Sequence, residues 1–411
     1  MNLFLSHSLY RVLSLSRVFS TLGAYIYNLV FVIYAASLPR PNFAIFLANI
    51  VPMIPILFTF WLGVKADRTD NKGRKMIVIG FVQALLFTII ALIINQGTYL
   101  VFSIICLLNV ISDCLSDFAS GLRLPILQEH VATDDLMEAY SFNQFLSYIC
   151  QIAGQFLGVW LLTISNQSYA LVAGINAVFY LLSALVLYSH RHNLTHQPVS
   201  TIREKIPLRQ RLKDLYQMME QIFQNSEQTS FASLLLSILV LNALGGGLGS
   251  IYNFYLLKVS LFGLPYGQAL ILVQIIFLAG AILGSLTPKD YFAKQSLSFL
   301  LVLNSGLFIL MGLSNLLNLP PILALLLLAF ASYLLGKANP KLDALLMANI
   351  PSETLAQASN FLGLMFTLSL PLGIFVFSAL ALYQLWLTWL VFTGFSLVAF
   401  GLVLINRQVN K

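Results

Sequence analysis

Charged residues are scarce in this sequence. Only 9% of its 411 residues are Asp, Glu, Lys or Arg, whereas 59% are hydrophobic and the mean hydropathy is +0.86. A soluble globular protein carries roughly 25% charged residues, so this chain has too little polar surface to face water. The deficit argues against a water-soluble protein and predicts one that exposes apolar side chains to lipid.

Cysteine and the common catalytic motifs are also missing. The three cysteines, Cys106, Cys114 and Cys150, lie inside apolar stretches without paired spacing, which argues against a disulfide or metal framework. No phosphate-binding loop of the form G-x-x-x-x-G-K-S/T occurs, and no nucleophile is paired with a base within the apolar segments. We therefore expect no cofactor, no metal site and no enzymatic activity.

Long apolar runs occupy most of the chain. Each is long enough to cross a hydrocarbon core of about 30 Å as an α-helix, and a β-barrel would show short alternating segments instead. The sequence thus predicts an all-α membrane protein. We expect about twelve transmembrane helices at residues 10–36, 43–64, 76–95, 99–122, 140–164, 169–188, 231–258, 265–287, 294–314, 320–346, 355–380 and 384–406.

The positive charge is confined to alternate connections. The net charge of +7 might suggest nucleic acid, but Lys and Arg cluster in the connections after the second, sixth and eighth segments and at the C-terminus, and the opposite side offers only Arg40 and Lys258. Positive residues favour the cytoplasmic side. We therefore expect no nucleic-acid partner and place both termini in the cytoplasm.

The two halves of the sequence repeat each other. Ile26-Tyr27-Asn28 recurs as Ile251-Tyr252-Asn253, Thr133 to Ala139 matches Ser352 to Ala358, and Gly154 then coincides with Gly373 in the same frame. Parallel repeats place a substrate site at their interface and expose it to each side in turn. The predicted organisation is a six-helix bundle at 1–188, a cytoplasmic linker at 189–230 and a second six-helix bundle at 231–411, acting as a monomer.

Two aspartates lie within the fourth apolar segment. A charge at the centre of a membrane helix costs about 2.5–3.5 kcal/mol on insertion scales, so such residues usually have a function. Asp113 lies near the middle of the segment, and Asp117 lies one turn nearer the cytoplasm on the same face. We expect Asp113 to bind a coupling proton or a cation. The alternative is a structural ion pair with Arg17, Arg123 or the loop at residues 65–75.

Polar and aromatic side chains also recur at helical spacing within the predicted helices, where they should face a cavity rather than lipid. The alternative for each is a hydrogen bond between helices, and Lys337 alternatively extends to the cytoplasmic interface. The substrate-cavity candidates are Arg17, Tyr25 and Asn28; Asn109; Gln144, Tyr148 and Gln151; Asn242, Tyr252 and Asn253; and Tyr333 and Lys337.

The connection after the second segment resembles the signature loop of the major facilitator superfamily. It contains Gly63-Val64-Lys65-Ala66-Asp67-Arg68 and then Lys72-Gly73-Arg74-Lys75, although four residues separate Arg68 from Gly73 where the family usually has one. The resemblance implies a secondary transporter in which Asp67 meets the start of the eleventh helix near Thr354. It also implies that Arg68 and Arg74 latch the two halves or pair with a fourth-helix carboxylate, for which Asp117 is the best candidate.

A second stretch is similar to one branch of that superfamily. Leu124-Pro125 through Ala139, followed by Gly154-x-x-x-Gly158, resembles bacterial macrolide efflux proteins and the enterobactin exporter, whereas the Gly-Pro pair of antiporters is absent from the fifth helix. The resemblance implies proton-coupled export of amphipathic organic compounds across a bacterial cytoplasmic membrane. A lysophospholipid or other lipid carrier is the closest alternative, since some of these carriers also have a lengthened signature loop.

Overall fold

The computed structural model is helical in every ordered element of the part of the chain it describes, which is residues 4, 7–67, 69–130, 136–194, 216–217, 219–221, 224, 230–287, 290–349 and 352–409. The chain divides into two compact units, Met1–Thr201 and Ile202–Lys411. The first unit contains α2 (Ser8–Ala36), α3 (Pro41–Ile50), η1 (Val51–Met53), α4 (Ile54–Asp67), α5 (Lys72–Ile93), η2 (Ile94–Gln96), α6 (Tyr99–His130), α7 (Leu136–Ile164) and α8 (Tyr169–Ser189). The second contains α10 (Phe231–Lys258), α11 (Tyr266–Leu286), α12 (Tyr291–Lys294), α13 (Leu297–Leu316), α14 (Pro321–Asn349), α15 (Ser352–Tyr383) and α16 (Leu385–Val409).

The predicted membrane helices are confirmed. Within the described residues, eleven helical segments are long and apolar enough to cross a bilayer, and the apolar part of α15 at Leu368–Tyr383 supplies a shorter twelfth. Their ends carry the expected signals. Pro41 and Pro321 start helices because a proline lacks only an N–H that the first turn leaves unbonded. The Ser168 and Ser296 hydroxyls accept hydrogen bonds from the first-turn N–H groups of Leu171 and Phe299.

The second predicted helix is interrupted, although the apolar run at residues 43–64 is continuous in sequence. The chain forms α3, one turn of 3₁₀ helix at Val51–Met53, and then α4. Pro52 and Pro55 explain the break, because each removes a backbone donor and crowds the preceding turn. Three apolar stretches therefore replace one continuous helix at 43–64.

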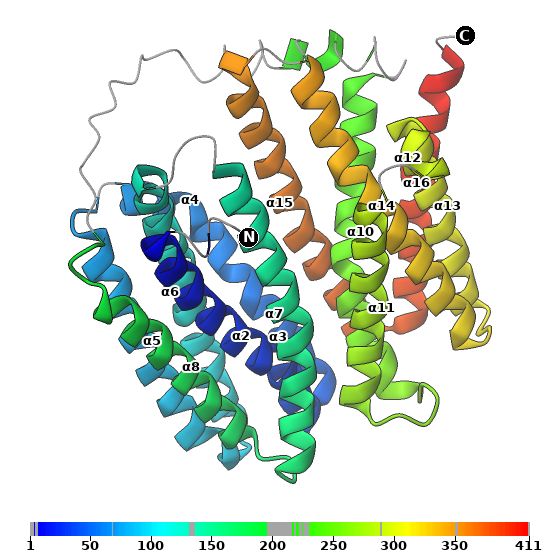
Figure 1. Ribbon diagram of the computed structural model, residues 1–411. Coiled ribbons are helices and arrows are strands. Elements are labelled where there is room, and N and C mark those ends of the chain that lie inside the picture. The colour runs from blue at the N-terminus through cyan, green and yellow to red at the C-terminus, as the bar shows by residue number, and fades with distance from the viewer. Residues whose placement is uncertain are drawn as a thin grey trace. The chain divides into compact units, whose positions relative to one another are not determined.

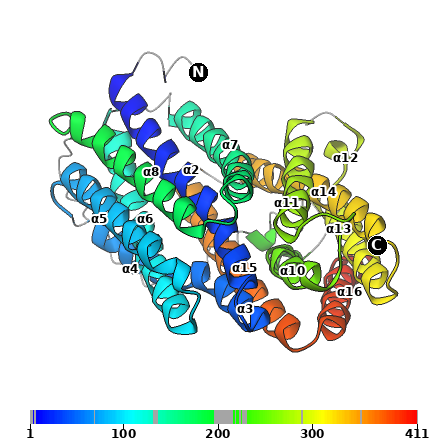
Figure 2. The same ribbon diagram turned by 90° about the horizontal axis from the view of Figure 1, so that it is seen from below.

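The helix packing repeats between the two units. In the first unit α2 packs against α7 and α8, α5 against α6 and α8, and α4 against α6 (Figure 1). In the second unit α10 packs against α15 and α16, α13 against α14 and α16, and α11 against α14 (Figure 2). When α3 and α4 are counted as one helix and the short α12 is left out, these are the same five pairs in each unit. The weak internal sequence repeat thus corresponds to a shared packing scheme.

Glycines allow the closest of these contacts. A Cβ at Gly154 or Gly158 of α7 would overlap the α2 backbone around Leu22 and Ile26, and a Cβ at Gly373 of α15 would overlap Ala243 of α10. Small residues four apart let helix backbones approach in membranes. The predicted match of Gly154 with Gly373 therefore falls on equivalent contacts, α7 with α2 and α15 with α10.

Replacing Gly158 with alanine should destabilise the first unit by about 1–3 kcal/mol, because the new methyl group meets the carbonyl oxygen of Ile26 and the two backbones must separate. Gly174→Ala in α8 is the matched control. Its Cβ would meet nothing within 4 Å, so this change should stabilise by up to about 1 kcal/mol through helix propensity. Thermal melting in detergent measures both, and equal melting temperatures for the two variants would refute the close-contact argument.

Candidate functional site

A polar cavity of about 270 Å³ lies inside the first unit, between α2, α5, α6 and α8. Four of the predicted site residues line it together: Arg17, Tyr25 and Asn28 of α2 and Asp113 of α6. Helical spacing explains the grouping, since residues 17, 21, 25 and 28 share one face of α2. The other polar and charged residues that line it are Ser16, Ser20, Thr21, Gln83, Ser116, Ser120, Arg123, Tyr180 and Ser183.

Hydrogen bonds between helices hold the walls of this cavity. The Gln83 side-chain amide of α5 donates to the backbone oxygen of Ser112 at 3.0 Å and to the Ser116 hydroxyl at 2.8 Å, both on α6 beside Asp113. The hydroxyls of Ser16 and Ser183, on α2 and α8, lie 2.8 Å apart. Such bonds fix the positions of the side chains that face the cavity.

The two aspartates of α6 have different surroundings. The Asp117 carboxylate accepts a hydrogen bond of 3.1 Å from Thr59 of α4, and Asp117 does not line the cavity. Asp113 does, and within the described part of the chain nothing donates a hydrogen bond to it or pairs with its charge. The alternative of a structural ion pair between Asp113 and Arg17 or Arg123 therefore has no contact to support it. The predicted role of Asp113 in binding a coupling proton stays a prediction.

Two arginines face the same cavity. Arg17 makes one long hydrogen bond, 3.4 Å from its Nη2 to the Ser147 hydroxyl of α7. The Nε of Arg123 is buried and has no hydrogen-bond partner. Asp113 and Arg123 lie ten residues apart on α6, about 15 Å along a helix axis, so the carboxylate does not neutralise this guanidinium.

Three other predicted residues of the first unit, Asn109, Tyr148 and Gln151, do not line this cavity. Asn109 is buried and its Oδ1 has no hydrogen-bond partner. Tyr148 is exposed on α7 and Gln151 is half-buried, and neither lines the cavity. The side chain of Gln144 lies outside the described residues. A substrate contact at these four positions remains a prediction.

The signature loop is only partly described. Gly63 lies in α4, where a Cβ would meet nothing within 4 Å, and Gly73 lies in the first turn of α5 against Leu194. Arg74 is exposed. Arg68 and the side chains of Asp67 and Thr354 lie outside the described residues. The predicted latch formed by Asp67, Arg68, Arg74 and Asp117 therefore stays a prediction.

In the second unit, three candidates lie on α10. Asn242 is half-buried, and the backbone oxygen of Asn253 accepts a 2.8 Å hydrogen bond from the Tyr266 hydroxyl. Tyr252 is buried with its hydroxyl unbonded, and its ring packs edge-on against Trp389 at 6.1 Å between centroids. Tyr252 thus belongs to an aromatic core, and the substrate contacts predicted for all three remain untested.

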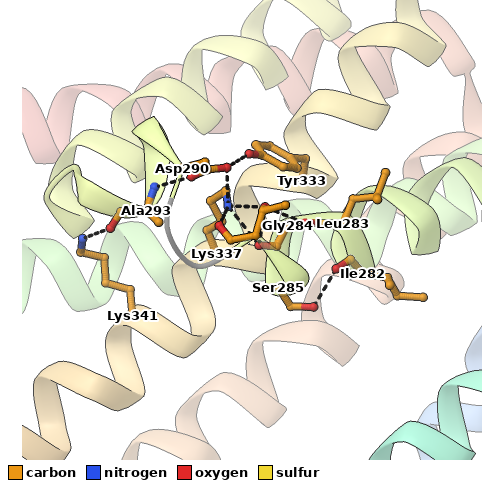
Figure 3. Close-up of polar contacts among 10 residues, drawn as sticks. Ile282, Leu283, Gly284, Ser285, Asp290, Ala293, Tyr333, Lys337 and Lys341 are labelled. Atoms are coloured by element: carbon orange, nitrogen blue, oxygen red, sulfur yellow. Dashed lines mark hydrogen bonds and ion pairs between the residues drawn. The ribbon is translucent and has the colours of Figure 1, made fainter.

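The remaining candidates, Tyr333 and Lys337 of α14, meet at a polar cluster that the sequence analysis did not predict. The Lys337 ammonium pairs with the Asp290 carboxylate at 2.7 Å and donates to the backbone oxygens of Gly284 and Thr287 at 3.1 and 2.7 Å. The Tyr333 hydroxyl also donates to Asp290. Figure 3 shows the ammonium between Asp290 and Gly284. Lys337 therefore reaches the connection after α11, where its side chain is 3% exposed and fully engaged.

The surroundings of Asp290 favour its ionised form. Partial burial opposes ionisation, but hydrogen bonds from Lys337, Tyr333 and the Ala293 backbone N–H outweigh it, together with the charge of Lys337. They hold the pKa of Asp290 below its usual range. Asp290 also caps α12, since its Oδ1 accepts the Ala293 N–H at 2.8 Å.

The stability of the second unit should therefore depend on pH through Asp290. A lowered folded-state pKa stabilises fully above the ordinary aspartate pKa of about 3.9, and this contribution is lost as pH falls through the folded value. Melting temperature measured between neutral and strongly acidic pH should fall less steeply for Asp290→Asn than for the wild type. Asp70→Asn, at an exposed loop residue, should keep the wild-type slope. Parallel curves for wild type and Asp290→Asn would contradict this assignment.

Comparison with known proteins gives a family match and structural neighbours. The Major Facilitator Superfamily matches residues 13–374. No curated protein sequence matches the chain. Among solved structures, the nucleoside transporter NupG is 14% identical, with a TM-score of 0.66 over 98% of this chain and 99% of that one. The POT family transporter PepTSo is 11% identical, with a TM-score of 0.68 over 98% of each chain. A bacterial homolog of the human lysosomal transporter Spinster is 13% identical, with a TM-score of 0.65 over 98% of each chain. At these identities the structures establish a common fold.

Proposed function

This chain belongs to the major facilitator superfamily, and from that premise we propose that it is a proton-coupled transporter that exports amphipathic organic compounds. It has the alternating-access fold of that superfamily and is a multi-pass membrane protein. The proposal adds the coupling ion, the direction and the kind of substrate.

The proposal of proton coupling rests on one observation. Asp113, which lies in a membrane helix, faces a polar cavity and has no bonding partner within the described residues. Asp113 lines that cavity beside Tyr180 and Ser116, and within the described residues it forms no ion pair. An unpaired carboxylate in an apolar segment binds a proton readily, because burial disfavours its charged form. A structural carboxylate would instead be held by a cation.

Competition at Asp113 would couple the proton to export. A proton and a cationic or hydrogen-bonding group of the substrate cannot occupy one carboxylate together, so binding of either releases the other. Protons entering down their gradient would then drive substrate out. The export direction rests on the similarity of residues 124–158 to bacterial exporters. The distribution of Lys and Arg supports an orientation with both termini in the cytoplasm. The similarity to bacterial exporters supports a bacterial cytoplasmic membrane, and we propose that the chain acts as a monomer.

A lysophospholipid carrier is the second candidate, and a specific feature of the second unit favours it. A pocket of about 370 Å³ between α10, α15 and α16 is lined almost entirely by apolar side chains, including Leu239, Leu372 and Phe395. Such a lining suits an alkyl chain. The lengthened signature loop points to the same class.

Transport into proteoliposomes with an imposed proton gradient tests both candidates. The purified chain is presented with a dye, a macrolide and a lysolipid, each with and without the gradient. We expect gradient-dependent movement of the dye and the macrolide. Movement indifferent to the gradient would overturn proton coupling, and movement of the lysolipid alone would establish the second candidate instead.

A further inference from the structure

We propose that Arg17 and Arg123 form an anion-binding subsite in the cavity of the first unit, which holds a carboxylate, phosphate or sulfonate group of the transported compound. This inference rests on the proposed function in taking that cavity to be the substrate cavity. It adds a chemical class, because the transported compounds would carry an acidic group.

The charge of the cavity supports the subsite. Among the residues that the structure describes, its lining holds two positive side chains, Arg17 and Arg123, and one negative side chain, Asp113. The positive charges exceed the negative one by one when Asp113 is ionised and by two when it is protonated. A membrane-embedded cavity with uncompensated positive charge attracts anions.

The two guanidinium groups are available to a ligand. Both line the same cavity, Arg17 from α2 and Arg123 from α6. Arg123 forms no hydrogen bond or ion pair within the described residues, and its Nε is buried without any partner. Arg17 is bonded only at 3.4 Å to Ser147, close to the limit of a hydrogen bond. A buried cation without a partner is costly, and an anion between two guanidinium groups would accept hydrogen bonds from both.

The position of the arginines separates this subsite from the proton site. Arg123 lies about three helical turns from Asp113 on α6, and Arg17 lies about two turns before Tyr25 on α2. The cavity thus has a positive end and a negative end. A compound with an acidic group at one end and a basic or hydrogen-bonding group at the other would occupy both. Only the second group would compete with the proton.

Equilibrium binding tests the subsite without any gradient. The full chain in phosphatidylcholine nanodiscs at neutral pH is titrated with p-aminohippurate, an aromatic carboxylate, and with its methyl ester, which lacks the charge. We expect the acid to bind more tightly than the ester. Arg17→Gln and Arg123→Gln should each weaken binding of the acid at least about tenfold, because each removes charged hydrogen bonds. The ester should bind all variants alike.

Three controls make the result decisive. Arg11→Gln changes an exposed arginine of α2 and should leave binding of the acid unchanged. Arg123→Lys keeps the charge and should retain part of the affinity. Arg123→Gln should keep or raise the melting temperature, because it removes a half-buried charge that has no partner within the described residues. Weaker binding would then not reflect unfolding.

Two results would overturn the proposal: an acid that binds wild type no more tightly than its ester, or undiminished binding of the acid by Arg123→Gln. Adding phosphatidylglycerol to the nanodiscs distinguishes the source of the anion. Competition with the acid in wild type identifies a lipid headgroup as a ligand of the subsite, and absence of competition identifies a soluble organic anion. Because binding is measured without a gradient, selectivity for the acid would survive even if gradient-driven transport failed.

Discussion

Protein carrying Asp113→Asn, reconstituted into liposomes, should still exchange substrate across the membrane but should not concentrate it in response to a proton gradient. The amide keeps the size of the carboxyl group and its place in the cavity but binds no proton in this pH range. Substrate can then bind and cross without releasing a proton, so the two fluxes become independent. Gradient-driven transport should fall to the level of exchange without a gradient.

The contacts around Asp113 make this variant informative. Because the carboxylate has no bonding partner within the described residues, its neutralisation breaks no ion pair. The melting temperature should stay the same or rise. Asp70→Asn is the matched control, since Asp70 is exposed in the loop between α4 and α5 and should transport as wild type does. Full gradient-driven transport by Asp113→Asn would refute the assignment of Asp113 to coupling, whatever its effect on binding.

The helices were predictable because the bilayer dictates their length. The predicted segments 169–188 and 231–258 agree with α8 and α10 to within one residue. The break at Pro52 was not predicted, because the apolar run continues through it. A proline has no backbone N–H to donate, and hydropathy does not reveal the loss of that hydrogen bond. The short helix α12 was also missed, because four residues show no periodicity.

The cavity was partly predictable for a related reason. Arg17, Tyr25, Asn28 and Asp113 were found because polar residues at helical spacing stand out against an apolar background. Arg123 considered alone had only the role of a possible ion-pair partner. Its proposed role in binding an anion depends on two facts: Arg17 of another helix lines the same cavity, and no carboxylate within the described residues pairs with Arg123. Neither fact can be read from a local sequence pattern.

The polar cluster of the second unit was missed because its members come from distant parts of the chain. The copy of the signature loop at Gly284 to Asp290 looks degraded in sequence. In the structure Asp290 nevertheless binds Lys337, and Lys337 also binds the carbonyl oxygens at the end of α11. In the first unit the Lys72 ammonium similarly binds the carbonyl oxygens of Ala66, in the last turn of α4, and of Thr69, just after it. A buried lysine at the end of the second helix is thus common to both units, although it comes from α5 in one and α14 in the other.

Removing that lysine from the second unit should be strongly destabilising. Lys337→Met would leave the buried carbonyl oxygen of Gly284 with a long hydrogen bond of 3.3 Å from the Thr287 hydroxyl, and losing a hydrogen bond from a charged group costs roughly 1.5–3 kcal/mol. The Thr287 backbone and hydroxyl oxygens lose the same partner, so the connection between α11 and α13 would be held to α14 by fewer bonds, among them those from Tyr333 to Asp290 and from Lys341 to Ala293. Lys258→Met, at an exposed lysine in the last turn of α10, is the matched control and should melt close to wild type.

A double-mutant cycle separates the ion pair from the rest of the cluster. Asp290→Asn alone leaves an ammonium that is 3% exposed beside a neutral amide, whereas Asp290→Asn combined with Lys337→Met removes both charges. Removing one member of a buried pair is more damaging than removing both. The double variant should therefore melt above the temperature expected from adding the two single effects. Strictly additive losses would mean that Lys337 acts only through the oxygens of Gly284 and Thr287, and that Asp290 acts only through Tyr333 and as the N-cap of α12.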